Sequence, residues 1–234
     1  MPHLTRHPPS LIELDPIVTR PAALPDRIYA TLKYRILTCA MLPSARIVEK
    51  DVCSEMQVSR TPLREALNRL ALEGLVTIAP FRGYAVAPLT IVGFRELCQV
   101  RRILEPEAAA LCAERATDED VKRLASLAEL RYRRGDPKTY ERYLRANSLF
   151  HQALVHAIHN SRLEAIVTGA LDQHQRPLYM GLGVGVDGKA STAEHKEIVE
   201  AIRQRNPAKA RKVMALHIVR AEERIASALE AAGY

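Results

Sequence analysis

The chain contains no tryptophan and only three phenylalanines among its 234 residues. It has no apolar run that approaches the roughly 20 residues a helix needs to cross a bilayer. Its amino terminus also lacks the basic and then apolar pattern of a secretory signal. We therefore expect a protein without a membrane partner, located in the cytoplasm.

Cysteine is also scarce, and no two cysteines have the Cys-x-x-Cys spacing of a redox or metal-binding motif. Three of the four fall within helical patterns, so we expect reduced thiols. The four cysteines are Cys39, Cys53, Cys98 and Cys112.

What the chain does contain is typical of a globular helical protein, since 47% of its residues are hydrophobic, 26% are charged, and alanine and leucine dominate.

The net charge of +7 permits an anionic partner but does not identify one. Residues 25–90 carry nine Lys or Arg against six Asp or Glu, and residues 91–234 carry 23 against 19. Because this surplus is spread along the chain, an argument for nucleic-acid binding has to rest on where individual basic residues stand.

Residues 1–24 are rich in proline and have no sustained periodicity, which predicts a flexible arm. Residues 25–90 then contain three short helical patterns and a hairpin. The third helix covers residues 60–73 and ends at Gly74, and the hairpin has alternating apolar residues on both sides of a tip at Gly83. This order of elements is typical of a winged helix-turn-helix domain.

After residue 90 the strand signals vanish, and six segments have helical periodicity. Thr117, the pair Ser191 and Glu194, and Asn206 mark predicted helix starts. Residues 91–234 therefore predict a bundle of about six helices. The predicted fold class is mainly α, with an N-terminal winged helix-turn-helix (three helices plus a β-hairpin) and a C-terminal all-helical bundle.

Residues 59–76 combine an apolar stripe with a polar and basic start. Arg60 and Arg64 are four residues apart and share a face that points away from the apolar stripe, and Ser59 can cap the helix. A solvated surface face is one interpretation. In a helix-turn-helix, however, the amino end of the second helix enters the major groove, where basic side chains contact phosphates and guanine edges. We therefore expect this end to stay unpaired in the free protein and to bind DNA.

Three histidines stand on apolar faces of separate helical segments. His151, His195 and His217 each have apolar residues at helical spacing, and Asn147 lies one turn before His151. A single histidine on such a face is usually a hydrogen-bonded core residue. Three of them on separate helices, with an amide beside them, favour a site for a divalent metal ion.

Arg101 is a candidate for binding an anion. Apolar residues flank it at helical spacing, which directs its guanidinium toward the core, where an unpaired charge is costly. Its partner is either Glu105, one turn later, or the carboxylate of a bound ligand.

Residues 183–190 nearly match a phosphate-binding loop. However, Ala190 stands where such a loop needs a hydroxyl group, and helix-like sequence precedes it instead of a strand. We expect a mobile connection between two helices there.

The stretch VSRTPLREALNRLALEGLV, followed by RGYAV, resembles the DNA-binding signature of the GntR superfamily of bacterial regulators. The carboxyl part resembles the helical effector domain of its FadR branch, the FCD domain, and the likeness covers roughly residues 26–230. It implies that Arg60 and Arg64 contact bases or phosphates. The remaining contacts that it implies are those of Ser59 and Thr61 with the DNA backbone, of Lys50 with phosphate, and of Gly83 with the minor groove.

The resemblance also implies a metal site, because the FCD pattern Asp/Asn-x-x-x-His, then His, then His matches Asn147, His151, His195 and His217. Many members have Asp at the first position, so the neutral Asn147 implies a lower affinity for the cation. The family pattern R-x-x-L-E selects Arg101 over Arg102 as the ligand-binding arginine. Gln57 stands where the family often has Gly, and a positive φ there would cost about 1 kcal/mol. The histidines outside the pattern, expected to be structural or exposed, are His156, His159 and His174.

These features predict a homodimeric transcription regulator, most relatives being repressors, that binds a palindromic operator in double-stranded DNA. A divalent metal ion (Zn²⁺, Ni²⁺ or Mn²⁺) and a small organic acid would bind together in the bundle, and no enzymatic activity is expected. Two alternatives are a metal-dependent hydrolase or lyase, and a DNA-binding protein with structural histidines that senses no ligand. Against the enzyme, no Glu or Asp has the spacing that marks a general base.

Overall fold

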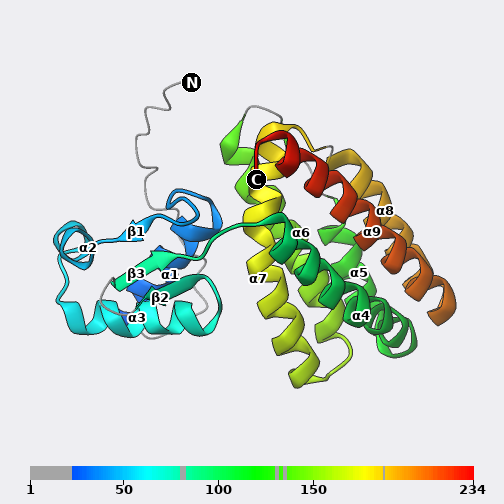
Figure 1. Ribbon diagram of the computed structural model, residues 1–234. Helices are drawn as coiled ribbons and strands as arrows, with labels where there is room; N and C mark the ends of the chain where they lie inside the picture. The colour runs from blue at the N-terminus through cyan, green and yellow to red at the C-terminus, as the bar shows by residue number, and fades with distance from the viewer. Residues whose placement is uncertain (1–22, 80–82, 130–131, 134–135, 187) are drawn as a thin grey trace.

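A computed structural model describes residues 23–79, 83–129, 132–133, 136–186 and 188–234. It has a winged part, up to residue 90, and a helical bundle after it (Figure 1). The predicted arm lies almost wholly outside the described residues. The helices are α1 (Leu24–Leu37), α2 (Glu49–Met56), α3 (Arg60–Leu72), α4 (Ile91–Arg115), α5 (Asp118–Leu127), α6 (Pro137–His156), α7 (Ser161–Val184), α8 (Gly188–Arg203) and α9 (Pro207–Ala231). The strands are β1 (Arg46–Ile47), β2 (Val76–Ala79) and β3 (Gly83–Val86).

The winged part packs α1, α2 and α3 around one core beside a small antiparallel sheet with strand order β1-β3-β2. The predicted hairpin is confirmed, since β2 and β3 pair with Val76 opposite Val86. β1 is an additional strand, which two residues are too few to reveal by alternation. Leu63, Leu67 and Leu70 of α3 are fully buried, as the apolar stripe predicts.

The turn between α2 and α3 contains Gln57 in the left-handed conformation, with φ 53° and ψ 47°. Gln57 therefore adopts the positive φ that a Gly would adopt at lower cost. Ser59 precedes α3, but its side chain makes no capping hydrogen bond within the described structure, so the predicted side-chain cap is wrong. α3 ends before Gly74, which has a φ of 71°, as predicted.

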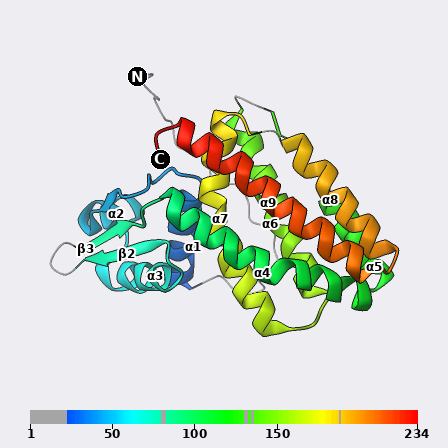
Figure 2. The same ribbon diagram turned by 45° about the vertical axis from the view of Figure 1, so that its right-hand side comes forward.

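The described part of the bundle contains α4 to α9, as the six periodic segments predict. α4 and α9 lie side by side along much of their length (Figure 2). The predicted starts at Thr117 and Asn206 are confirmed by capping hydrogen bonds. The start at Ser191 is wrong, because α8 begins at Gly188 and both Ser191 and Glu194 are buried inside it. No described helix is both long and apolar enough to cross a bilayer.

α7 runs ten residues beyond the stretch 161–174 that its sequence pattern predicts, and continues through Pro177. Leu178 and Leu182 are buried after the proline, so packing holds the helix where local propensity would end it. α7 lies between the winged part and the rest of the bundle (Figure 1).

Polar contacts join α7 to the winged part. Lys33 Nζ lies 2.5 Å from Asp172 Oδ2, and Arg176 Nη1 donates to the carbonyl oxygen of Ala87 at 2.7 Å. Gln173 Nε2 donates to the carbonyl oxygen of Glu73 at 3.1 Å. One turn of α7 therefore contacts α1, the end of α3 and the segment that leads into α4.

Candidate functional site

The bundle brings the three predicted histidines together. His151 comes from α6, His195 from α8 and His217 from α9, and each offers a ring nitrogen within 4.8 Å of the other two. His195 Nε2 and His217 Nε2 are 3.3 Å apart. All three are at most 3% exposed. The packing of three helix faces thus produces one buried cluster from residues far apart in the chain.

Two of the three rings have a carboxylate at Nδ1. Glu194 Oε2 lies 2.8 Å from His217 Nδ1 in a hydrogen bond. Glu105 Oε2 lies 2.6 Å from His151 Nδ1, at an angle that is not that of a good hydrogen bond. The third histidine, His195, stacks on Phe150 with ring centroids 4.1 Å apart. Its Nδ1 has no hydrogen-bond partner among the described residues.

An arginine holds each of these carboxylates. Arg224 Nη1 and Nη2 donate to the two oxygens of Glu194 at 2.8 and 2.9 Å. Arg101 Nε donates to Glu105 Oε1 at 2.5 Å, and both residues are 2% exposed. Of the two partners considered for Arg101, Glu105 is therefore the one that it contacts in the structure.

Burial and these pairs set the protonation states. Burial lowers the pKa of His217 to about 4, although Glu194 opposes the shift. Burial, together with His217 and His151, holds the pKa of His195 well below its usual range. Burial alone would raise the pKa of Glu194, but His217 and Arg224 outweigh it and lower that pKa to about 2. Near pH 7 the two rings are therefore neutral and Glu194 is ionised.

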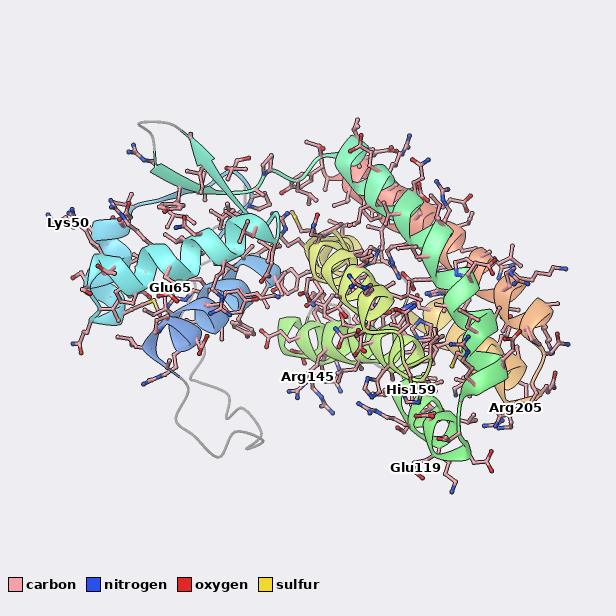
Figure 3. All side chains as sticks on the ribbon, turned by 90° about the horizontal axis from the view of Figure 1, so that it is seen from below. Lys50, Glu65, Glu119, Arg145, His159 and Arg205 are labelled. Atoms are coloured by element: carbon pink, nitrogen blue, oxygen red, sulfur yellow. The ribbon has the colours of Figure 1, made fainter. Side chains whose placement is uncertain are left out.

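A narrow cavity of about 10 Å³ lies against this cluster, close to the space that one water molecule needs. Asn147, 6% exposed, lines it together with Arg101. His174 of α7 also lines it, is 3% exposed, and has no partner for its Nε2 in the described structure. Of the three histidines expected to be structural or exposed, His174 is therefore buried and lines the cavity. His156 and His159 are exposed, and Figure 3 shows His159 at the edge of the bundle.

The cluster fits a divalent cation. A cation bonded to two imidazole nitrogens at about 2.1 Å in a tetrahedral arrangement holds them about 3.4 Å apart, close to the 3.3 Å between the Nε2 atoms of His195 and His217. His151 Nε2 is buried and has no hydrogen-bond partner within the described residues. Neutral imidazole is a ligand that Zn²⁺, Ni²⁺ and related ions accept. The three histidines could therefore hold a metal ion.

The sequence patterns missed two residues of this cluster. Glu194 has the spacing of a capping box with Ser191, and Arg224 belongs to none of the motifs described above. The available signal was spacing, because Arg224 lies seven residues after His217 and so returns to the same face of α9. Glu105 and Glu194 both touch the cluster, although neither has the sequence spacing that marks a general base.

The basic end of α3 lies on the surface of the winged part. Arg60 and Thr61 are exposed, and Lys50 points away from the bundle at the outer end of α2 (Figure 3). Arg64 is exposed but not unpaired, because its Nε lies 2.8 Å from Glu49 Oε2. That expectation is wrong because packing of α2 on α3 brings together residues 15 apart in sequence, which periodicity within one helix cannot reveal.

The wing is attached to the same helix. Tyr84 of β3 donates to Asn68 Oδ1 of α3 at 2.9 Å, which joins wing and helix. Gly83, with a φ of 77°, starts β3, and a Cβ there would meet nothing within 4 Å. Gly83, the predicted tip, is therefore the first residue of a strand, and residues 80–82 before it lie outside the described residues.

The near-match to a phosphate-binding loop, residues 183–190, overlaps the end of α7 and the start of α8, so the connection between the two helices is shorter than expected. α7 precedes it instead of a buried strand, and α8 already begins at Gly188. The described residues therefore do not have the strand-loop-helix order of such a site.

Curated proteins that are similar to this chain include transcriptional regulators. HTH-type transcriptional regulator McbR of Escherichia coli (strain K12) is 33% identical over 128 residues, which cover 53% of this chain and 57% of that protein. The Nta operon transcriptional regulator of Aminobacter aminovorans is 35% identical over 121 residues, 52% of this chain and 57% of that protein. The chain thus spans little more than half the length of these two relatives.

Among solved structures, E. coli McbR/YncC superposes with a TM-score of 0.73 at 22% identity, covering 87% of this chain and 97% of that one. This likeness shows that the fold is shared. Residues 24–86 match the family described as bacterial regulatory proteins, gntR family, and residues 96–220 match the FCD domain. The chain therefore belongs to the gntR family of bacterial regulatory proteins and carries an FCD domain.

Proposed function

We propose that this protein is a transcription regulator, a repressor, whose affinity for an operator is controlled by a small organic acid bound with a divalent metal ion in the bundle. One observation carries the proposal: the winged part has an exposed basic helix start, and the bundle has a buried cluster of three histidines beside a cavity. Membership of the gntR family supports the DNA-binding half.

DNA would be bound by the first turn of α3. Arg60 and Thr61 are exposed there, and the hydroxyl of Ser59 is not used as a helix cap. The ion pair of Arg64 with Glu49 does not prevent this role, because an exposed pair is weak and can be exchanged for a phosphate or a guanine edge. Lys50 and Gly83 would add contacts to phosphate and to the minor groove.

The metal would be held by His151, His195 and His217, with the side-chain oxygen of Asn147 as a further neutral ligand. When bound, the ion supplies positive charge that polarises and attracts an anionic ligand. Among the charged groups at the cavity, Glu105 and Glu194 offset Arg101 and Arg224. A divalent cation would therefore leave the cavity with positive charge, to which a carboxylate is complementary.

Arg101 would share in binding that carboxylate. Its Nε and Nη2 face Glu105, and a guanidinium has five N–H donors, so donors remain for a ligand. The cavity of about 10 Å³ is too small for an organic acid as it stands. Binding would therefore move the cavity wall, and a ligand with different affinity for two shapes of a protein shifts the balance between them.

The shift would reach the DNA-binding part through α7. His174 of α7 lines the cavity, while Asp172, Gln173 and Arg176 on the same turn contact the winged part. A displacement of this turn would change how the winged part is held. In a homodimer it would alter the spacing of two recognition helices, which a palindromic operator detects. Exposed apolar side chains on α4, such as Val92 and Ile103, support association with a second copy.

The direct test is selection of double-stranded DNA sequences by the full-length protein, followed by operator titrations at fixed salt with and without Zn²⁺ and a panel of organic acids. We expect a palindromic site and an acid that weakens binding. His195→Ala should reduce bound metal and the response to the acid while sparing DNA binding, and His156→Ala, at an exposed histidine, should change neither. A variant His195→Ala with the metal content of the parent would contradict the proposal.

A metal-dependent hydrolase or lyase is the second candidate, because two carboxylates lie beside the histidines. Each is already engaged by an arginine, which leaves neither available as a general base. Turnover of organic acids that is lost in His151→Ala would favour the enzyme.

The other alternative is a DNA-binding protein whose histidines are structural. A melting temperature that does not change with a chelator, Zn²⁺, Ni²⁺ or Mn²⁺ would favour it.

A further inference from the structure

We propose that Glu194, held by Arg224, is a positioning residue that keeps the proton of His217 on Nδ1 and so directs the Nε2 lone pair at a divalent cation. This inference rests on the metal site proposed above, and adds the residues that would set its geometry.

A carboxylate that an arginine holds faces a histidine twice, from different helices, and the contact of Glu194 with His217 is the one with hydrogen-bond geometry. In one, His217 and Arg224 of α9 enclose Glu194 of α8. In the other, Arg101 and Glu105 of α4 face His151 of α6. Because no helix contributes to both, a single packing accident does not explain the repetition.

The chemistry follows from the neutral imidazole, which has one N–H and one lone pair. A carboxylate can only accept, so the ring nitrogen that faces it carries the proton. With the proton of His217 on Nδ1, its lone pair is on Nε2, the atom that lies 3.3 Å from His195 Nε2. Carboxylates that hold metal-binding histidines in this way fix the tautomer and ring orientation and raise the basicity of the ligand nitrogen.

The arginines keep the carboxylates in place. Arg224 occupies both oxygens of Glu194 and also donates to Ser191 Oγ at 3.3 Å, one turn earlier on α8. This fixes the carboxylate relative to α8 and α9 together. Among the described residues no carboxylate bonds to His195 Nδ1, and this ring stacks on Phe150 instead. Because a carboxylate holds His217 and an aromatic ring holds His195, a substitution of Glu194 should change the orientation of His217 and not that of His195.

The experiment uses the full-length protein and Zn²⁺ alone, with affinity measured by competition with a chromophoric chelator. Glu194→Met, which removes the acceptor but keeps the volume, should weaken Zn²⁺ binding roughly 10–100-fold. Glu194→Gln retains an acceptor and should recover part of that loss. The absorption spectrum of bound Co²⁺ should change in Glu194→Met, because the ring orientation changes.

Glu222→Met is the matched control. Glu222 lies on α9, the helix of His217, is largely buried, and pairs with Arg102 of α4 at 3.0 Å, but no contact with a histidine is found for it in the described structure. Its substitution should lower stability without changing Zn²⁺ affinity. A loss of affinity as large as that of Glu194→Met would mean that Glu194 is merely structural, and would overturn the inference.

A second measurement does not need the metal. Nitrogen chemical shifts of the ¹⁵N-labelled histidines in the metal-free protein report the tautomer, and we expect His217 to carry its proton on Nδ1 in the parent and to lose this preference in Glu194→Met. The opposite tautomer in the parent overturns the inference alone. Absence of any binding of Zn²⁺, Ni²⁺ or Mn²⁺ by the parent would instead overturn the proposed metal site, and the inference with it.

Discussion

Asp172 of α7 lies 2.5 Å from Lys33 of α1, which ties the bundle to the winged part through residues 139 apart in sequence. Both side chains are largely buried at this junction, and Glu73 approaches Lys33 from a second side at 2.9 Å. Although burial alone would lower it, the pKa of Lys33 is raised by the hydrogen bonds that its ammonium donates to Asp172, Tyr29 and Glu73. The junction is therefore a charged cluster that is favoured only while the two parts stay together.

Asp172→Asn should loosen this junction, because it removes one charge of a partly buried pair worth about 1–3 kcal/mol. We expect amide hydrogen exchange in α1 and around Gly74 to become at least about fivefold faster, since local opening becomes easier. Asp118→Asn, at an exposed site of the bundle, is the control and should leave these amides unchanged. Equal exchange in Asp172→Asn and the parent would show that the junction does not hold the two parts.

Arg64→Ala should abolish selective operator binding, with a loss of at least about tenfold in affinity at fixed salt, because a guanidinium that reads a base edge has no substitute. Glu49→Gln should act in the opposite direction, since it releases Arg64 from its ion pair. Arg69→Ala is the control, because Arg69 lies at the other end of α3 and pairs with Asp26. If Arg64→Ala retains the operator affinity of the parent, the recognition helix is wrongly assigned.

Asn147→Asp should raise the affinity for Zn²⁺ about tenfold, because it adds a negative oxygen ligand to a set of neutral ones. Competition with a chelator at pH 7.5 measures the change. Asn160→Asp makes the same substitution at the cap of α7, where Asp caps as well as Asn does, and should leave the affinity unchanged. An unaltered affinity in Asn147→Asp would remove Asn147 from the proposed ligands.

Metal-free protein should lose stability as the pH falls from about 6.5 toward 4. His217 and His195 have pKa values below their usual range in the folded state, chiefly because of burial. In this window the unfolded chain binds more protons than the folded one, so the free energy of unfolding rises with pH. The slope is at most about 1.4 kcal/mol per pH unit for each histidine.

Urea unfolding at pH 7.5 and 5.5, with a chelator present, measures this slope. His217→Gln should reduce it, because one of the two protons is no longer taken up on unfolding. His156→Gln, at an exposed histidine, should not change it. A stability that is equal at both pH values would contradict the assigned protonation states.

Local sequence was sufficient for most of the elements. Apolar residues at helical spacing identified the buried face of α3, and Thr117 and Asn206 identified the starts of α5 and α9. Local rules failed at Ser191, where a correct capping pattern lies inside a helix, and at Pro177, where burial of Leu178 and Leu182 carries α7 past a proline. In both places tertiary packing outweighed a local preference worth about 1–3 kcal/mol.

The candidate site also has features that local sequence predicts and features that it does not. The spacing of apolar residues around His151, His195 and His217 was enough to predict that all three face the core. It could not reveal that Glu194 meets His217, or that Glu49 meets Arg64, because these pairs join different helices.

The amino-acid sequence by itself determined the kinds of elements, the buried faces and the family, because these depend on residues within a few turns of one another. Only the tertiary structure decided which charges neutralise each other, which histidine has a carboxylate behind it, and which turn of α7 joins the cavity to the winged part. Those relations depend on how helices pack, and packing is set by the summed shape of many side chains rather than by any local pattern.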